Sequence, residues 1–361
     1  MSVLRVLHLV GSPTNQSFCD MSMLYASGCI DALHNPAKYE FVIALVMPDG
    51  LWRFPPSLER SAVQVTLPVG MADALAILIA AKIDIAIPHL FCLAGMTDYR
   101  AMLDVLKVPY VGNRPLQMAL AADKAKTRIL VEAAGVHVPQ AQLLRKSDGS
   151  LPTLTPTLPL PVVVKPNNAD NSDGLTLVLA EADYAQALAK AFSFSDTVLV
   201  EAYIPLGREV RGGLAMDGDI LRTLPLQEYR MDTATKPVRA RIDKLKRDDK
   251  QELAFAAKDA LHTWIVPVDD PITHTVWDAV LRCHSALGCE QYSLFDFRID
   301  PQGRAWFLEA GLYCSFSPKS VLVAMMAAAG TPLDVFFDSA IRLAMRTDAM
   351  PDPLAASLLR R

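Results

Sequence analysis

Two carboxylates near the end of the chain have the spacing of a cation-binding pair. Asp296 and Glu309 lie in two short apolar runs that flank the polar sequence DPQG at 300–303. Pro and Gly in such a short polar gap predict a β-hairpin, which would set the two carboxylates nearly opposite each other. Because a buried carboxylate is costly when unpaired, either Arg298 or Arg304 forms an ordinary salt bridge here, or a Mg²⁺ ion binds between the carboxylates.

Two lysines have the surroundings expected of phosphate-binding groups. Lys165 lies in the buried strand predicted over 161–166, and a loop of small polar residues, 167–174, follows it. Backbone N–H groups of such a loop and one lysine can hold phosphates, although a plain hairpin loop has the same composition. Lys124 lies near the start of a helix predicted over 123–134.

The segment 197–211 combines acidic and apolar residues in a way that suits a nucleoside. A predicted strand leads to Glu201, and an apolar connector then leads to Glu209. Backbone groups of such a connector can bind the edge of adenine, and carboxylates can hold ribose hydroxyls. The following segment, 228–251, is rich in charge. It is either a solvated loop or a mobile lid whose cations close over phosphates.

Length and composition limit the class of protein. A chain of 361 residues suits two or three domains, and 52% hydrophobic residues with 20% charged residues exclude global disorder. The net charge of −4 does not favour nucleic acid as a partner. The six cysteines contain no Cys-x-x-Cys pair and no zinc spacing, so we expect reduced thiols in a cytoplasmic protein.

The first third of the chain alternates strands with helices. Strands are predicted over 3–10, 40–47 and 83–87, and helices near 19–33, 71–81 and 98–106. This order predicts an α/β domain with a mainly parallel sheet, and charged residues within 71–88 argue against a membrane span. Ligands of such sheets bind at the carboxyl ends of strands, so we expect Asp20 and His89 near one site. A capping or core role is the alternative for His89.

The ordered set of motifs resembles a known family. Lys124, Lys165, the run 200–211 and the hairpin occur in the order found in ATP-grasp ligases, and the chain resembles the D-alanine–D-alanine ligase family over about residues 3–345. The resemblance implies ATP and Mg²⁺ as cofactors, small-molecule substrates and a homodimer. The implied ATP-grasp fold has an N-terminal parallel α/β substrate domain at 1–114, a central domain at 115–207, and a C-terminal catalytic domain at 208–361 that carries the Mg²⁺ site and the mobile loop 228–251. In the C-terminal part we also expect helices over 252–263, 275–287 and 320–328.

The resemblance implies roles residue by residue. Lys124 and Lys165 match the phosphate-contacting lysines, Ser172 the loop serine over the phosphates, and Lys244 the lysine of the lid. The residues that match the adenosine pocket are Glu201, Tyr203, Ile204 and Glu209. Asp296 and Glu309 match the metal pair. The implied catalytic residues are Lys165, Lys244, Arg298 and Ser320, and the implied substrate-binding residues are Asp20, His89, Ser315, Lys319 and Ser320.

Two positions depart from the family's pattern. Leu294 stands where the family has an arginine that supports the oxyanion of a tetrahedral intermediate, and Arg298 is the candidate to replace that arginine. Gly311 stands where the family has an asparagine metal ligand, so that water or Ser315 would complete the metal site. These departures favour an electrophile other than an ordinary acyl phosphate.

A narrower resemblance follows from the same hairpin. Asp296-Phe297-Arg298 and the run 309–316 look like the ligases that join an amino acid to mycosporine-glycine, as do Arg53-Phe54-Pro55 and 208–211. This resemblance implies that ATP phosphorylates the enolised carbonyl oxygen of the cyclohexenone. Serine, threonine or glycine would then displace phosphate, giving a UV-absorbing product such as shinorine. The alternatives are a D-alanine–D-alanine or other dipeptide ligase, and a non-catalytic ATP-binding scaffold.

Overall fold

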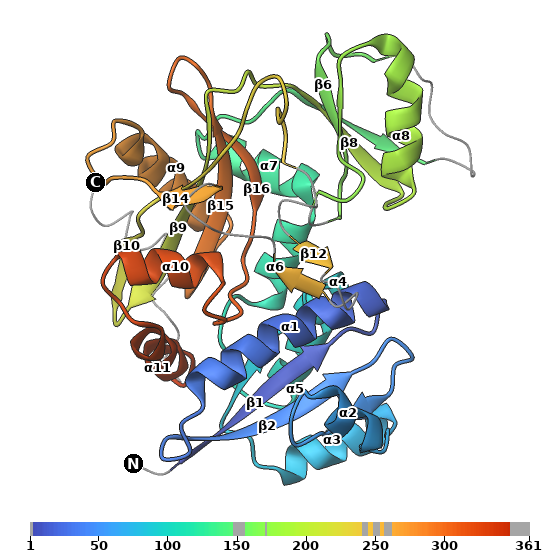
Figure 1. Cartoon of the computed structure of the whole chain (residues 1–361), viewed down its shortest axis with the longest axis vertical. Helices are drawn as coiled ribbons and strands as arrows, with labels where there is room; N and C mark the ends of the chain where they lie inside the picture. Colours follow the sequence, from blue (N-terminus) through green and yellow to red (C-terminus); the bar gives the residue numbers. More distant parts are fainter. Residues whose placement is uncertain are drawn as a thin grey trace.

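The computed structural model describes residues 3–146, 156–169, 172–239, 245–247, 253–255 and 262–346. Three parts are visible in Figure 1: an N-terminal layer in blue, a small unit around β6, β8 and α8, and a larger C-terminal part around β9, β15 and β16. Each part has its own sheet and its own cluster of buried apolar side chains. The predicted mixed α/β fold is therefore confirmed.

The N-terminal sheet has the strand order β3-β2-β1-β4. Its strands are β1 (Leu4–Gly11), β2 (Tyr39–Val46), β3 (Trp52–Arg53) and β4 (Ile85–Pro88). The helices are α1 (Gln16–Leu33), α2 (Arg60–Val65), α3 (Met71–Ala80), α4 (Leu93–Met96) and α5 (Asp98–Val105). Strand β1 pairs in parallel with both β2 and β4, and only the edge strand β3 is antiparallel. The alternation of strands and helices thus produces the parallel sheet that we expected.

Two consecutive helices link the first and second sheets. They are α6 (Pro115–Ala122) and α7 (Lys124–Ala133), and Asp123 lies between them. The Asp123 side chain caps α7 by accepting a hydrogen bond of 3.1 Å from the backbone N–H of Lys126. Both helices pack against β16 of the C-terminal sheet. This packing places Lys124, the first residue of α7, between the two later sheets.

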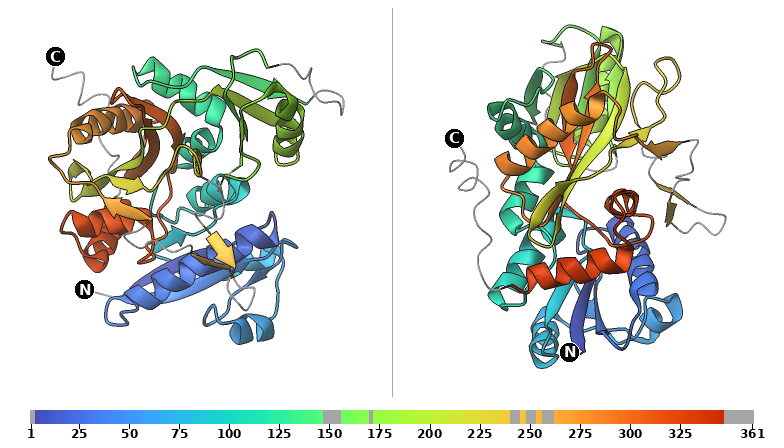
Figure 2. Two further views of the ribbon diagram at one scale, coloured as in Figure 1. Left: turned by 45° about the horizontal axis from the view of Figure 1, so that its top comes forward. Right: turned by 90° about the vertical axis from the view of Figure 1, so that its left-hand side faces the viewer.

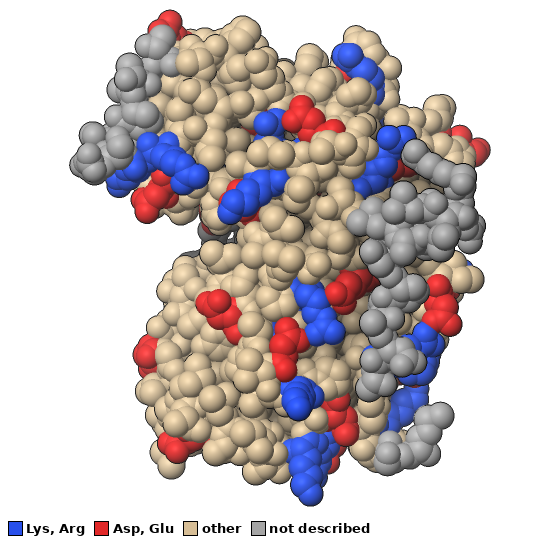
Figure 3. Space-filling view, turned by 180° about the vertical axis from the view of Figure 1, so that it is seen from behind, with Lys and Arg blue, Asp and Glu red and all other residues tan. Residues whose placement is uncertain are grey.

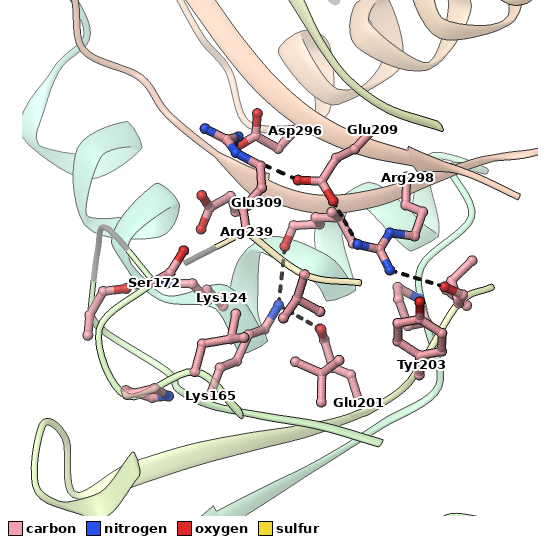
Figure 4. A pocket seen from close by; sticks show the side chains of 18 of the residues that line it. Lys124, Lys165, Ser172, Glu201, Tyr203, Glu209, Arg239, Asp296, Arg298 and Glu309 are labelled. Carbon is pink, nitrogen blue, oxygen red and sulfur yellow. Dashed lines mark hydrogen bonds and ion pairs between the residues drawn. The ribbon is translucent and has the colours of Figure 1, made fainter. Parts of the chain in front are cut away.

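The central unit is an antiparallel sheet with the order β5-β8-β6-β7. Its strands are β5 (Ala141–Arg145), β6 (Val162–Pro166), β7 (Thr176–Val178) and β8 (Thr197–Ala202). A short 3-10 turn (Glu181–Asp183) leads into α8 (Tyr184–Phe192), which covers one face of this sheet. The other face carries Lys165 and Glu201 toward the C-terminal sheet, as Figure 4 shows.

The C-terminal sheet has the order β14-β11-β9-β15-β16, with β10 paired to β9. Its strands are β9 (Arg208–Asp217), β10 (Ile220–Thr223), β11 (Gln227–Tyr229), β14 (Thr263–Ile265), β15 (Tyr292–Ile299) and β16 (Ala305–Ala310). The remaining helices are α9 (Ile272–Ala286), α10 (Val321–Ala328) and α11 (Leu333–Ala344). Every residue of β15 is buried. The predicted hairpin is present as β15 and β16, and Asp296 pairs with Glu309 in register.

The helix that we expected over 252–263 is wrong. Residues 253–255 form strand β13 (Leu253–Phe255), which pairs with β12 (Leu245–Arg247), and Thr263 begins β14. Strand β14 pairs with β11 on the edge of the C-terminal sheet, so tertiary pairing overrides the local helical composition. The β12–β13 hairpin lies beside α1 of the N-terminal layer (Figures 1 and 2).

Two surface properties bear on partners. On the face shown in Figure 3, acidic and basic side chains are interspersed rather than separated into patches of one sign. Among the described residues no single helix has the length and apolar character needed to cross a membrane. The pair α10 and α11 meets those two criteria only when its members are taken together, across a bend of 109°.

Candidate functional site

A pocket lies between the central and C-terminal sheets (Figure 4). Side chains from β6 and β8 form one wall, and side chains from β9, β15 and β16 form the other. The pocket is lined by ten residues that the sequence singled out: Lys124, Lys165, Ser172, Glu201, Tyr203, Ile204, Glu209, Asp296, Arg298 and Glu309. The structure therefore brings together residues that are separated by more than half of the chain.

Lys165 and Glu201 form a buried ion pair on the central sheet. The Lys165 Nζ lies 2.6 Å from Glu201 Oε2, and the two side chains are only 8% and 6% exposed. Arg128 from α7 contributes a second cation, 3.8 Å from Glu201 Oε1. Lys165 also donates a hydrogen bond of 3.4 Å to the carbonyl oxygen of Leu308 on β16. The lysine ammonium thus lies between the two sheets and points into the pocket.

Lys124 lines the same pocket and is held by the loop that follows β6. Its Nζ donates to the carbonyl oxygen of Ala169 at 2.5 Å, and Asn167 binds the backbone N–H of Ala125 at 2.8 Å. Ser172 has a φ of +62°, the left-handed conformation that non-glycine residues rarely adopt. The loop after β6 is therefore folded back over the start of α7, with Ser172 lining the pocket.

Arg298 lines the pocket beside the connector that joins β8 to β9. Its Nη2 donates to Glu209 Oε2 at 2.7 Å, and its Nη1 donates to the carbonyl oxygen of Ile204 at 3.3 Å. The guanidinium also lies 5.2 Å from the centre of the Tyr203 ring. Glu209 and Arg298 face each other because their strands pair in this register. Tyr203, Ile204 and Glu209 thus converge on one arginine, whereas Glu201 pairs with Lys165.

The partner of Asp296 differs from our expectation. Neither arginine of the hairpin neutralises it: Arg298 pairs with Glu209, and Arg304 pairs with Asp300 at 2.7 Å. Arg211 on β9 does so instead, with its Nε bound to Asp296 Oδ1 and its Nη2 2.5 Å from Oδ2. The physical reason is the register, because Arg211 lies directly across from Asp296 in the β9–β15 pair.

Electrostatics reinforce this arrangement. Burial alone would lower the pKa of Arg211, but the charge of Asp296 raises that pKa well above its usual value. Arg239 adds a third cation to the same cluster: it lies 3.9 Å from Asp296 Oδ2, 3.9 Å from Glu209 Oε1 and 3.6 Å from the centre of the Tyr229 ring. The carboxylates of the pocket are therefore surrounded by fixed guanidinium groups.

The donor set at the hairpin fits a hard divalent cation. Asp296 and Glu309 are opposite each other and both line the pocket, and carboxylate oxygens are the protein ligands that Mg²⁺ prefers. Arg211 binds both oxygens of Asp296, so a cation at this site would compete with that guanidinium for the carboxylate. Such an ion would neutralise charge on a bound triphosphate.

The residues expected to bind the acceptor substrates do not line this pocket. Asp20, on α1, accepts a hydrogen bond of 2.7 Å from Gln16, and Ser320 is the residue that precedes α10. Ser315 accepts a 3.3 Å hydrogen bond from the backbone N–H of Ser317, and Lys319 is exposed. These positions and their roles remain predictions. Lys244 lies outside the described residues.

His89 is a core residue in this structure. It is completely buried, and its Nε2 lies 3.0 Å from Nδ1 of the equally buried His8. Burial lowers the pKa of His8 to about 3 and that of His89 well below its usual value. The two histidines and Cys29 have the grouping of metal ligands. However, the outer ring nitrogens find no hydrogen-bond partner among the described residues, so the support that orients metal-bound histidines is missing.

The fold and the pocket define the class of protein as ATP-grasp, with two antiparallel sheets facing each other across a pocket of lysines and carboxylates. A sequence profile of the family described as "D-ala D-ala ligase C-terminus" matches residues 130–341. The chain belongs to this family.

Two curated relatives illustrate the similarity. The chain is 33% identical to a D-alanine–D-alanine ligase of Halalkalibacterium halodurans over 204 residues, which are 56% of this chain and 62% of that protein. It is 30% identical to the uncharacterized protein y4sG of Sinorhizobium fredii over 235 residues, 65% of this chain and 66% of that protein. The chain thus matches slightly less than two thirds of the length of these relatives.

Solved structures extend the likeness over nearly the whole chain. The VanG D-Ala:D-Ser ligase from Enterococcus faecalis has a TM-score of 0.74 at 20% identity, covering 95% of this chain and 100% of that one. A D-alanine–D-alanine ligase from Bacillus anthracis, complexed with ATP, has a TM-score of 0.68 at 20% identity, covering 96% and 98%. At this level of identity, the likeness establishes the fold.

Proposed function

We propose that this protein is an ATP-dependent, ADP-forming carbon–nitrogen ligase. The observation that carries the proposal is the convergence of Lys124, Lys165, Asp296 and Glu309 on a single pocket between two sheets. Phosphoryl transfer needs positioning and charge neutralisation more than covalent chemistry, and these four side chains supply both. A non-catalytic scaffold would need neither the lysines nor the carboxylate pair.

The nucleotide would lie along the pocket with its two ends in different surroundings. Adenosine would occupy the end formed by Tyr203, Ile204 and Glu209, and the phosphates the end formed by Lys124 and Lys165. Ser172 would cover the phosphates, and Lys244 would approach from the predicted lid. Asp296 and Glu309 would hold Mg²⁺, whose charge would offset that of the phosphates.

The lysines must exchange partners when the nucleotide binds. Lys165 now pairs with Glu201 at 2.6 Å, and Lys124 with the carbonyl oxygen of Ala169 at 2.5 Å. Phosphate oxygens are stronger partners for the Lys124 ammonium than a carbonyl oxygen is, and for Lys165 they carry more negative charge than the single Glu201 carboxylate, which Lys165 shares with Arg128. Both lysines would therefore turn toward the phosphates, and Glu201 would keep Arg128 as a counter-ion.

We rank D-alanine or a related small amino acid first among the substrates. The relatives and solved neighbours named above include D-alanine–D-alanine ligases and a D-Ala:D-Ser ligase. The comparisons thus favour the dipeptide-ligase alternative over the mycosporine-glycine hypothesis. In this reaction one carboxylate is phosphorylated, and the amine of a second amino acid displaces phosphate.

A second candidate keeps support from one structural detail. Leu294 is buried where the family has its oxyanion-binding arginine, and Arg298 cannot replace that arginine while it is bound to Glu209 and Ile204. A vinylogous acid such as mycosporine-glycine needs less oxyanion support, because the ring delocalises charge as phosphate leaves. Joining a free amino acid to mycosporine-glycine is therefore the second proposal.

One assay separates the candidates. ADP and phosphate release would be measured with Mg²⁺ and ATP for D-alanine alone, for D-alanine with D-serine, and for mycosporine-glycine with serine, threonine or glycine. The first proposal predicts ADP release with the D-amino acids. The second predicts release only with mycosporine-glycine, together with an absorbance shift to longer wavelength. Failure of every mixture, at a rate no higher than that of Lys165→Met, would contradict both.

A further inference from the structure

Arg211 is the most closely held cation at the metal pair, yet the family resemblance implies no role for it. It lies on β9 directly across from Asp296 on β15 and grips both carboxylate oxygens. The Arg211 side chain is 20% exposed, whereas that of Asp296 is 6% exposed. The guanidinium therefore binds a buried carboxylate from a more open position.

The surroundings of Arg211 place it beyond the nucleotide pocket. Asp296 lines that pocket and Arg211 does not. On its other side Arg211 approaches α1 of the N-terminal layer: burial raises the pKa of Tyr25 to about 12, and the positive charge of Arg211 opposes that shift. Tyr25 also packs against Phe91, with 5.2 Å between ring centres. The substrate whose oxygen accepts the terminal phosphoryl group of ATP would enter from this side.

Charge balance suggests what the arginine does. Three guanidiniums, those of Arg211, Arg239 and Arg298, face three carboxylates, those of Glu209, Asp296 and Glu309. Among the described residues, these six charges balance one another. A divalent cation at Asp296 would add positive charge beside Arg211, and two cations a few ångströms apart repel each other strongly in a partly buried site.

We propose that Arg211 is a catalytic residue that exchanges partners. It neutralises Asp296 in the empty site, and it turns to the oxyanion of the acceptor substrate when Asp296 binds Mg²⁺. This inference rests on the proposed ligase function. Leu294 stands where the family has an arginine. Arg211, on the neighbouring strand β9, would supply the cation that is absent from that position.

The reaction transfers the terminal phosphoryl group of ATP and then forms the carbon–nitrogen bond. The acceptor oxygen forms a bond to the terminal phosphorus of ATP while the bond to ADP breaks, and Arg211 compensates negative charge on the acceptor. The amine then forms the carbon–nitrogen bond, phosphate leaves with the acceptor oxygen, and the amine proton passes to solvent. Arg211 keeps its own proton throughout, as a guanidinium does in proteins.

The test measures metal binding and turnover in the same variants. Mn²⁺ is the probe, titrated into the nucleotide-free protein while its free concentration is followed by electron paramagnetic resonance. Arg211→Met removes the group that competes with the metal ion for Asp296, so the variant should bind Mn²⁺ at least about tenfold more tightly than the wild type. Its kcat with MgATP should fall by about 10²–10³-fold. Arg211→Lys keeps the positive charge but not the bidentate contact. Its Mn²⁺ affinity and its kcat should therefore lie between those of Arg211→Met and those of the wild type.

Matched controls make each outcome decisive. Arg222→Met removes an exposed arginine whose partner on the same sheet is Asp217, 3.0 Å away, and both readouts should stay at the wild-type value. Weaker Mn²⁺ binding together with lower kcat in both Arg211 variants would show a merely structural role and overturn the inference. Unchanged turnover would overturn it as well. If the wild type itself is inactive, the proposed function fails, while the Mn²⁺ titration still tests the competition at Asp296.

Discussion

Replacing either member of the Lys165–Glu201 pair should destabilise the protein, and replacing both should cost less than the two single losses added together. The two side chains are almost fully buried and lie 2.6 Å apart. Removing one partner of a buried ion pair leaves an uncompensated charge and typically costs about 3–5 kcal/mol. In the variant with both Lys165→Met and Glu201→Gln, only Arg128 is left without its carboxylate, so the loss should be clearly smaller than the sum of the two single losses.

The two single replacements should not be equal. After Lys165→Met, Glu201 still has Arg128 at 3.8 Å as a counter-ion, so this change should fall near the lower end of that range. After Glu201→Gln, Lys165 and Arg128 are both left without their carboxylate, and the loss should lie near the upper end. Turnover separates the variants in a different way from stability. Every variant that lacks Lys165 loses a phosphate contact and should turn over slowly.

Denaturant unfolding of the four proteins supplies the double-mutant cycle. A matched control is the exposed pair Arg282–Asp278 on α9, whose side chains are 49% and 64% exposed, where the coupling should be well below about 1 kcal/mol. Additive losses at Lys165 and Glu201, or a coupling as small as that of the control, would refute the idea of a tightly coupled buried pair.

Three further predictions concern the metal, the pH dependence and the lid. Glu309→Gln and Asp296→Asn should each abolish turnover with MgATP, the latter with some loss of stability because Arg211 loses its partner; near-normal turnover in both would mean that the hairpin is only salt-bridged. Burial lowers the pKa of His284 to about 4, so unfolding free energy should fall by about 1.4 kcal/mol per pH unit from this group as pH drops from 6.5 toward 4, and His284→Gln should flatten that slope. Tryptic cleavage within 228–251 should slow when MgATP binds, and an unchanged rate would count against a lid.

The sequence predicted those features that depend on local chemistry. The turn at 300–303 specified the hairpin, whereas the β-bulge between Asp296 and Phe297, which shifts the register by one residue to set Asp296 opposite Glu309, was not predicted. The alternation of apolar strands and helices specified the parallel N-terminal sheet in the same way. The division into 1–114, 115–207 and 208–361 remains a prediction, although each of the three large sheets lies within one of these ranges.

Contacts that depend on strand order could not be predicted. The partner of Asp296 is Arg211, 85 residues away along the chain, and nothing near the hairpin indicates that β9 is its neighbour. Arg211 was visible only as part of the run 208–211. The expected helix over 252–263 failed for a related reason, because β14 gains its hydrogen bonds from β11 rather than from its own neighbours in sequence.

The most direct test of the central claim follows an oxygen atom. The ligase reaction would be run with a phosphoryl-accepting substrate labelled with ¹⁸O, either in the carboxylate of D-alanine or in the cyclohexenone carbonyl of mycosporine-glycine, and the released phosphate would be analysed by mass spectrometry. A phosphorylated acceptor predicts one ¹⁸O atom in inorganic phosphate for each ADP formed. Unlabelled phosphate, or release of AMP and pyrophosphate, would contradict the proposed mechanism.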